Sequence, residues 1–99
     1  MDGLDIRLES DGRLLVLRLT GTLDGRTAHA VTDALLALPP LPLVVDFSQV
    51  RTFVDLSVDA LTRALRDRPV FLTGLGRHQA RMFRYFGLRT DEREHSAEA

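Results

Sequence analysis

The fold is decided by one stretch of the sequence, residues 44–61, which reads VVDFSQVRTFVDLSVDAL. It starts inside a short apolar run, residues 41–45, whose β-branched pair before Asp46 predicts a strand covered on both faces. We expect a loop over 47–54 with two apolar side chains, Val50 and Phe53. Asp55 then stands where a helix N-cap would. Apolar residues follow at helical spacing and predict a helix to about residue 66: Leu56, Ala60, Leu61, Ala64 and Leu65.

Two strands and a helix are predicted before this stretch. Apolar and polar residues alternate over 4–9 and 15–20, and the turn residues SDGR at 10–13 predict an antiparallel hairpin between them. The GTLDG stretch at 21–25 breaks the alternation. Apolar residues spaced three or four apart then predict a helix over 26–38, ended by Pro39-Pro40. Strand, helix and strand in succession form a right-handed parallel crossover, with the helix on one face of the sheet.

A further strand and helix are predicted after it. Residues 70–73 form a short apolar strand, and the turn at Gly74-Leu75-Gly76 leads to a helix over 78–86 that Gly87 ends. Its expected core face is Met82, Phe83 and Phe86. The order ββαβαβα predicts a single α/β domain over 1–90, a mixed sheet packed with helices. The charged tail, 91–99, is expected to be a short helix or disordered.

Composition excludes several classes of function. The 99 residues are 44% hydrophobic and 27% charged, carry a net charge of −1 and include no cysteine, so disulfides and thiolate chemistry are excluded. All 13 basic residues are arginine, which removes lysine-dependent mechanisms. The near-zero net charge disfavours nucleic acid and anionic membranes as partners. Apolar runs too short to span a bilayer and an acidic start predict a cytoplasmic protein without membrane insertion.

No residue pattern indicates catalysis, a cofactor or a metal. The three histidines have no metal-ligand spacing, and we expect them at the surface. The Gly74-x-Gly76 turn lacks the third glycine of a dinucleotide fingerprint, because Gln79 takes its place. Neither Ser48 nor Ser57 lies in a hydrolase motif. We therefore expect no enzyme. One side of the last helix carries three arginines that form either a solvated face or a surface for an acidic partner: Arg77, Arg81 and Arg84.

The deciding stretch resembles the STAS domain, the family of bacterial anti-sigma factor antagonists, stressosome subunits and cytoplasmic domains of sulfate transporters. DFS at 46–48 matches the family's strand ending in Asp-x-Ser, and FVD at 53–55 matches the approach to its helix start, Asp-Ser-Ser-Gly-Leu. GTLD at 21–24 resembles the family's Gly-x-Leu-Asp. LTG at 72–74, with 83–88, resembles its last strand, helix and Gly-Leu ending. The likeness covers about residues 4–90.

The resemblance implies a non-catalytic module that binds an anti-sigma factor or serine kinase, but one position departs from the family. The serine that follows the helix-starting aspartate, which the partner kinase phosphorylates in antagonists, is Leu56 here. Ser57 matches the second serine and is the possible phosphoacceptor, with Thr52 as another substitute. The expected partner-binding residues are Asp24, Thr52, Asp55, Leu56, Ser57 and Asp59.

Three further readings of the resemblance stay open at this stage. The chain is alternatively a subunit of a larger assembly, either a lipid-transporter ATPase complex or a stressosome. A small-ligand sensor domain is a second alternative, and a homodimer is possible in each case.

Overall fold

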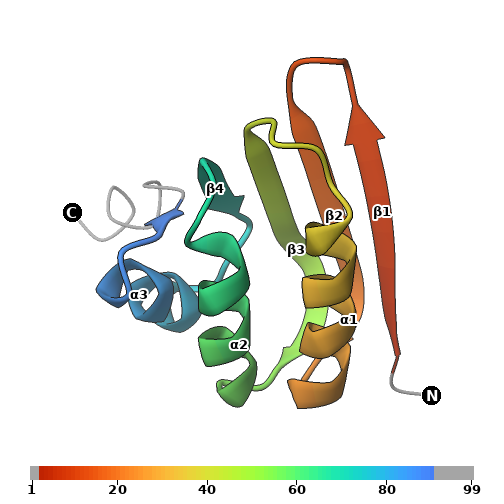
Figure 1. Cartoon of the computed structure of the whole chain (residues 1–99). Coiled ribbons are helices and arrows are strands. Elements are labelled where there is room, and N and C mark those ends of the chain that lie inside the picture. The colour runs from red at the N-terminus through yellow and green to blue at the C-terminus, as the bar shows by residue number, and fades with distance from the viewer. Residues whose placement is uncertain (1–2, 91–99) are drawn as a thin grey trace.

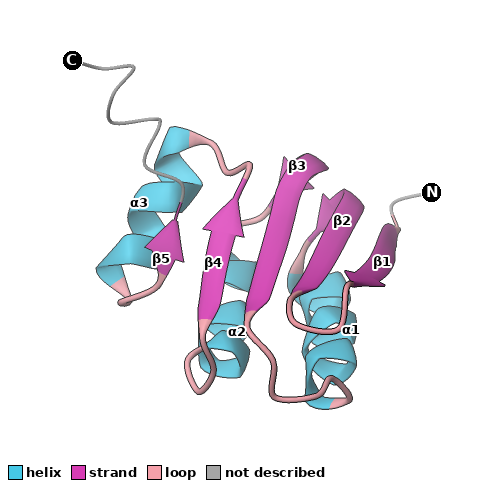
Figure 2. Cartoon of the chain, turned by 90° about the horizontal axis from the view of Figure 1, so that it is seen from above, coloured by secondary structure: helices cyan, strands magenta, loops and turns pink. Residues whose placement is uncertain are grey.

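The chain folds into one five-stranded mixed sheet with three helices (Figures 1 and 2). The computed structural model describes residues 3–90, so the predicted tail, 91–99, lies outside the described residues. The strands are β1 (Leu4–Ser10), β2 (Leu15–Leu23), β3 (Leu43–Phe53), β4 (Val70–Thr73) and β5 (Arg89–Thr90), and they lie in that order across the sheet. The helices are α1 (Gly25–Leu36), α2 (Leu56–Leu65) and α3 (Arg77–Tyr85).

The strand directions confirm the predicted mixed α/β architecture. β1 pairs antiparallel with β2, and β2, β3, β4 and β5 pair in parallel. The hairpin turn is held by the Asp11 carboxylate, which accepts hydrogen bonds from the backbone N–H groups of Arg13 and Leu14 at 2.9 and 3.0 Å. Gly12 supplies the positive φ, +91°, that this turn requires.

The core lies between one face of the sheet and the helices. Figure 2 shows α1 and α2 against that face and α3 beside the β4–β5 edge. Alternate residues of the central strands point into the core and are 3% exposed or less: Leu15, Leu17, Leu19, Leu23, Leu43, Val45, Phe47 and Leu72. On the opposite face Arg18 forms ion pairs with Glu9 and Asp46, at 3.4 and 2.7 Å. This polar face explains the alternation seen in the sequence.

Two strands are longer than the sequence predicted. β3 continues to Phe53 where a loop over 47–54 was expected, and β2 continues to Leu23 through the expected break. Between the pairs Arg18–Asp46 and Thr20–Gln49, β3 contains one residue more than β2, and a second extra residue follows Val50. Such bulges disrupt the two-residue period on which a strand is recognised.

The C-terminal end of the fold also differs from the prediction. The two-residue strand β5 was missed because so short a strand carries no period. The core face of α3 is Ala80 and Phe83, both 0% exposed, whereas Phe86 is 39% exposed and lies after the end of the helix. Of the expected core face, Phe83 is buried and Met82 packs partly buried against the core, so the prediction was wrong for Phe86 alone.

Candidate functional site

The candidate residues gather where β2 and β3 end and α1 and α2 begin. Because these strands are parallel, both helix N-termini lie at one edge of the sheet, at the bottom of Figure 1. The Val54 N–H donates a 2.8 Å hydrogen bond to the Leu23 carbonyl and ties the two strand-to-helix connections together. The carboxyl edge of a parallel sheet is where folds of this kind place their sites.

Asp24 is the N-cap of α1. Its backbone is extended, with φ −129° and ψ −171°, and its carboxylate accepts the Thr27 N–H at 2.9 Å. The Thr27 hydroxyl in turn accepts the Asp24 N–H at 2.8 Å, which completes a capping box. The hydrogen bond from the Thr27 N–H lowers the pKa of Asp24 below its ordinary value. The predicted docking residue Asp24 thus also starts its own helix.

Asp55 occupies the N-cap position of α2, as the sequence predicted, but its side chain does not cap the helix. Its backbone is helical, with φ −56° and ψ −30°, and its side chain makes no capping hydrogen bond, because a side-chain cap needs extended backbone at that position. Its Oδ2 instead lies 2.9 Å from Nε2 of His78, in the first turn of α3. Both side chains are more than half exposed. The Asp55 carboxylate therefore lies at the surface and links the start of α2 to the first turn of α3.

Leu56 projects into solvent at the first residue of α2. Its side chain is 76% exposed, and the preceding Val54 is 39% exposed. The core face of the helix is formed by residues further along, such as Val58 and Leu61, each 1% exposed. The sequence pattern had grouped Leu56 with these apolar positions. The structure instead leaves an apolar side chain at the surface beside the Asp55 carboxylate.

Ser57 is buried and already bonded. It is 0% exposed, and its hydroxyl donates a 2.7 Å hydrogen bond to the Val54 carbonyl. The Ser57 N–H donates to the same carbonyl at 2.9 Å. A kinase would have to open the first turn of α2 to reach this hydroxyl, so the conformation seen here does not present Ser57 as a phosphoacceptor.

Thr52 and Asp59 lie on either side of the helix start. Thr52 is exposed near the end of β3, opposite Thr22 of β2. Asp59 is exposed in the first turn of α2 and forms an ion pair with Arg63 at 3.0 Å. We call Thr52, Val54, Asp55, Leu56, Asp59 and His78 the α2 entry surface. Sequence reasoning missed His78 here, since no spacing linked it to Asp55.

Asp46 and Ser48 have a structural role. Partial burial raises the pKa of Asp46, but hydrogen bonds from Ser48 and Arg18 outweigh it and hold that pKa below its ordinary value. The Ser48 N–H donates to Oδ1 of Asp46 at 2.9 Å. A Cβ on Gly74 would lie 2.5 Å from the Ser48 nitrogen, so this corner needs glycine there. The Asp-x-Ser motif therefore closes the junction of β3 and β4.

Comparison with known proteins places this arrangement in a family. A family model described as "Mlab, STAS domain" matches residues 6–90. The chain belongs to the STAS domain family. A search of the curated proteins gave no match. Within residues 3–90 no helix is long and apolar enough to cross a membrane, and no group of three or more acidic, histidine or cysteine side chains is arranged to hold a metal.

Solved structures share the STAS fold at low sequence identity. An anti-sigma factor antagonist from Mycobacterium paratuberculosis has a TM-score of 0.71 and 20% identity, over 98% of this chain and 94% of that one. A variant of RsbS from Moorella thermoacetica has a TM-score of 0.66 and 19% identity, over 87% and 85%. The Bacillus cell fate determinant SpoIIAA in its phosphorylated form has a TM-score of 0.65 and 15% identity, over 95% of this chain and 97% of that one. These likenesses confirm the predicted fold.

Proposed function

We propose that this STAS domain is a non-catalytic, cytoplasmic protein-interaction module that binds a regulatory protein through the α2 entry surface. The proposed partner is an anti-sigma factor or serine kinase, or the ATPase of a larger assembly. Membership of the STAS family supports a protein partner, as does the fold shared with an anti-sigma factor antagonist.

The observation that carries this proposal is the exposure of Leu56. A leucine that is 76% exposed contributes little to folding, so it gains most of its possible burial energy only when a partner covers it. It stands between the carboxylates of Asp55 and Asp59, and the exposed Thr52 lies nearby in the sequence. An apolar centre within a polar rim is the usual arrangement of a protein interface.

We further propose that binding here is not switched by phosphorylation at the helix start. Leu56 has no hydroxyl, and the hydroxyl of Ser57 is buried against the Val54 carbonyl. Adding a phosphate of about −2 charge at this surface would repel an acidic or apolar partner. Thr52, which is exposed, stays as the substitute acceptor to be tested.

Affinity capture with a matched pair of variants tests the proposal. Leu56→Asp places a charge at the centre of the α2 entry surface, and Leu36→Asp does the same at an equally exposed position, 79%, in the last turn of α1. We expect a specific partner to be captured by the wild type and by Leu36→Asp but lost with Leu56→Asp. Its identity separates a sigma-regulating kinase, a transporter ATPase and a second copy of this chain. Equal capture by both variants would exclude this surface.

A small-ligand sensor is the second candidate, and one hollow favours it. A cavity of about 300 Å³ opens at the carboxyl ends of β3 and β4, lined in part by Arg51, Gln79 and the Gly74–Gly76 turn. Thermal unfolding with a panel of nucleotides and small anions tests it. A rise in Tm that Arg51→Ala removes would support a sensor, and no rise with any compound would oppose it.

A further inference from the structure

A second surface lies on α3, on the part of the chain with the most uneven charge. Five arginines and His78 occur between residues 68 and 90, and no aspartate or glutamate does. Arg84 turns inward, because it donates a 2.7 Å hydrogen bond to the Thr90 hydroxyl. Arg81 is exposed on the outer side of α3. This part of the molecule therefore presents positive charge to solvent.

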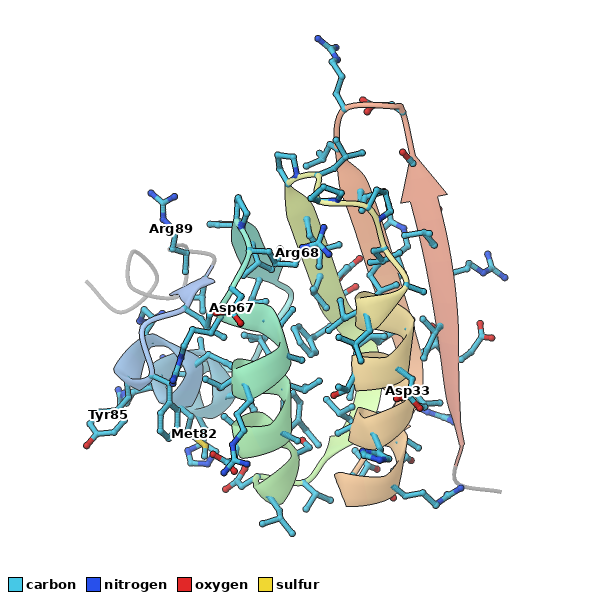
Figure 3. All side chains as sticks on the ribbon, in the orientation of Figure 1. Asp33, Asp67, Arg68, Met82, Tyr85 and Arg89 are labelled. Atoms are coloured by element: carbon cyan, nitrogen blue, oxygen red, sulfur yellow. The ribbon has the colours of Figure 1, made fainter. Side chains whose placement is uncertain are left out.

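The same side of α3 carries a hollow lined mostly by apolar groups. It has a volume of about 350 Å³ and is lined by His78, Arg81, Met82, Tyr85 and Phe86. We call these five residues the Tyr85 patch. Tyr85 is 84% exposed and Phe86 is 39% exposed, and their rings meet edge to face with centroids 5.3 Å apart. Figure 3 shows Tyr85 pointing away from the body of the molecule.

Tyr85 and Phe86 are not needed to hold α3 in place, whereas Met82 is partly buried against the core. The helix packs through Ala80 and Phe83, both 0% exposed, and the Phe83 ring contacts those of Phe47 and Phe53 at centroid distances of 5.8 and 6.2 Å. Aromatic residues, methionine and arginine are the types enriched at protein interfaces. Tyrosine and arginine are also among the residue types enriched where binding energy concentrates.

We propose that the Tyr85 patch binds an acidic segment of a partner polypeptide that carries an apolar side chain. Carboxylates of the segment pair with Arg81, and the apolar side chain enters the hollow against Met82, Tyr85 and Phe86. Charge complementarity selects this occupant, because Arg81 is exposed and the sequence of α3 contains no acidic residue. His78 belongs to both surfaces, but the proposal stands on Arg81, Met82, Tyr85 and Phe86, which are not part of the α2 entry surface.

An anionic bilayer is the competing occupant, because basic and aromatic residues on one helix face also suit a membrane surface. The position of Asp55 argues against it. Its carboxylate lies 2.9 Å from His78, at the edge of the Tyr85 patch, where a flat anionic surface would have to approach it. A peptide segment can run along α3 and leave this carboxylate uncovered. We therefore favour the polypeptide.

The experiment is an NMR titration of the isotope-labelled full chain with three short synthetic peptides. The first peptide is rich in glutamate and contains one phenylalanine and one leucine. The second keeps its charges but has serine in place of both apolar residues, and the third keeps the apolar residues but has glutamine in place of glutamate. Arg81→Glu and Tyr85→Ser test the patch. Arg13→Glu, in the exposed hairpin turn, is the matched control.

We expect the first peptide to shift the backbone amide signals of α3 and to bind more tightly than the other two. Arg81→Glu and Tyr85→Ser should each weaken binding by about tenfold or more, and Arg13→Glu should leave it unchanged. Equal binding of the first two peptides, signal shifts confined to other elements, or no binding would overturn the proposal. If the chain does not bind the first peptide but sediments together with phosphatidylglycerol vesicles, the patch is assigned to a membrane instead.

Discussion

Shortening two leucines of the same helix should lower stability by very different amounts. Leu56 and Leu61 both belong to α2, but Leu56 is 76% exposed and Leu61 is 1% exposed. Full burial of a leucine is worth about 1.5–3 kcal/mol, so the quarter of Leu56 that is covered contributes about 0.5 kcal/mol. Alanine also has the higher helix propensity, which offsets part of that loss. Leu61→Ala removes core atoms and leaves a cavity, at a cost of about 2–5 kcal/mol.

Urea unfolding followed by circular dichroism measures both variants against the wild type. We expect Leu56→Ala to lower the free energy of unfolding by less than about 0.5 kcal/mol and Leu61→Ala by about 2–5 kcal/mol, with unchanged m-values. A loss of about 2 kcal/mol or more for Leu56→Ala would show that its side chain is packed in the core. That result would remove the main reason for placing a docking surface at the start of α2.

Three further predictions concern the switch position, a turn and a cap. Incubation with a cognate serine kinase and ATP should leave Ser57 unmodified by mass spectrometry, while Leu56→Ser should gain a phosphate; stoichiometric phosphate on Ser57 would refute this. Gly74→Ala should lower the free energy of unfolding by about 2–5 kcal/mol, because strain at positive φ adds to a clash with the backbone. Gly87→Ala has open space around its Cβ and should cost only about 1–2 kcal/mol. Equal losses for the two variants would refute the clash at Gly74. Because the pKa of Asp24 is lowered in the folded state, this carboxylate stabilises the fold above its ordinary pKa of 3.8, and that stability is lost as pH falls through the folded pKa. Asp24→Asn should therefore make the free energy of unfolding depend less on pH in the acid range. An unchanged acid transition would contradict this.

The fold was predictable from the sequence wherever a pattern repeated over several residues. The hairpin of β1 and β2 was recognised because the strands alternate regularly and the turn carries Asp11 and Gly12. The second half of β3 was missed because two bulges interrupt its period, although Phe47 and Phe53 still reach the aromatic cluster with Phe83. Local periodicity predicts regular elements and fails where pairing is irregular.

The candidate site was predictable in position but not in detail. The resemblance to the STAS family marked the start of α2, and the structure shows Leu56 exposed there. It did not predict the contact between Asp55 and His78, because the two residues are 23 positions apart and meet only through the packing of α3 beside α2. Ser57 and Leu56 are adjacent in sequence but point about 100° apart on the helix, and Ser57 is buried whereas Leu56 is exposed.

The sequence also did not show which of the two aspartates, Asp24 or Asp55, caps its helix with its side chain. The sequence placed Asp55 both at a helix N-cap and in the docking surface, and gave Asp24 a docking role only. Asp24 has the extended backbone that a cap requires and makes the capping box, whereas Asp55 has helical backbone and faces outward. A cap depends on backbone angles, which residue type alone does not determine.

If a partner covers Leu56, isothermal titration of that purified partner should depend on this side chain. Leu56→Asp and Leu36→Asp are equally exposed substitutions on different helices. We expect Leu56→Asp to weaken the affinity by about thirtyfold or more, the loss typical at the centre of an interface, while Leu36→Asp matches the wild type. Equal affinities for all three proteins would contradict this expectation.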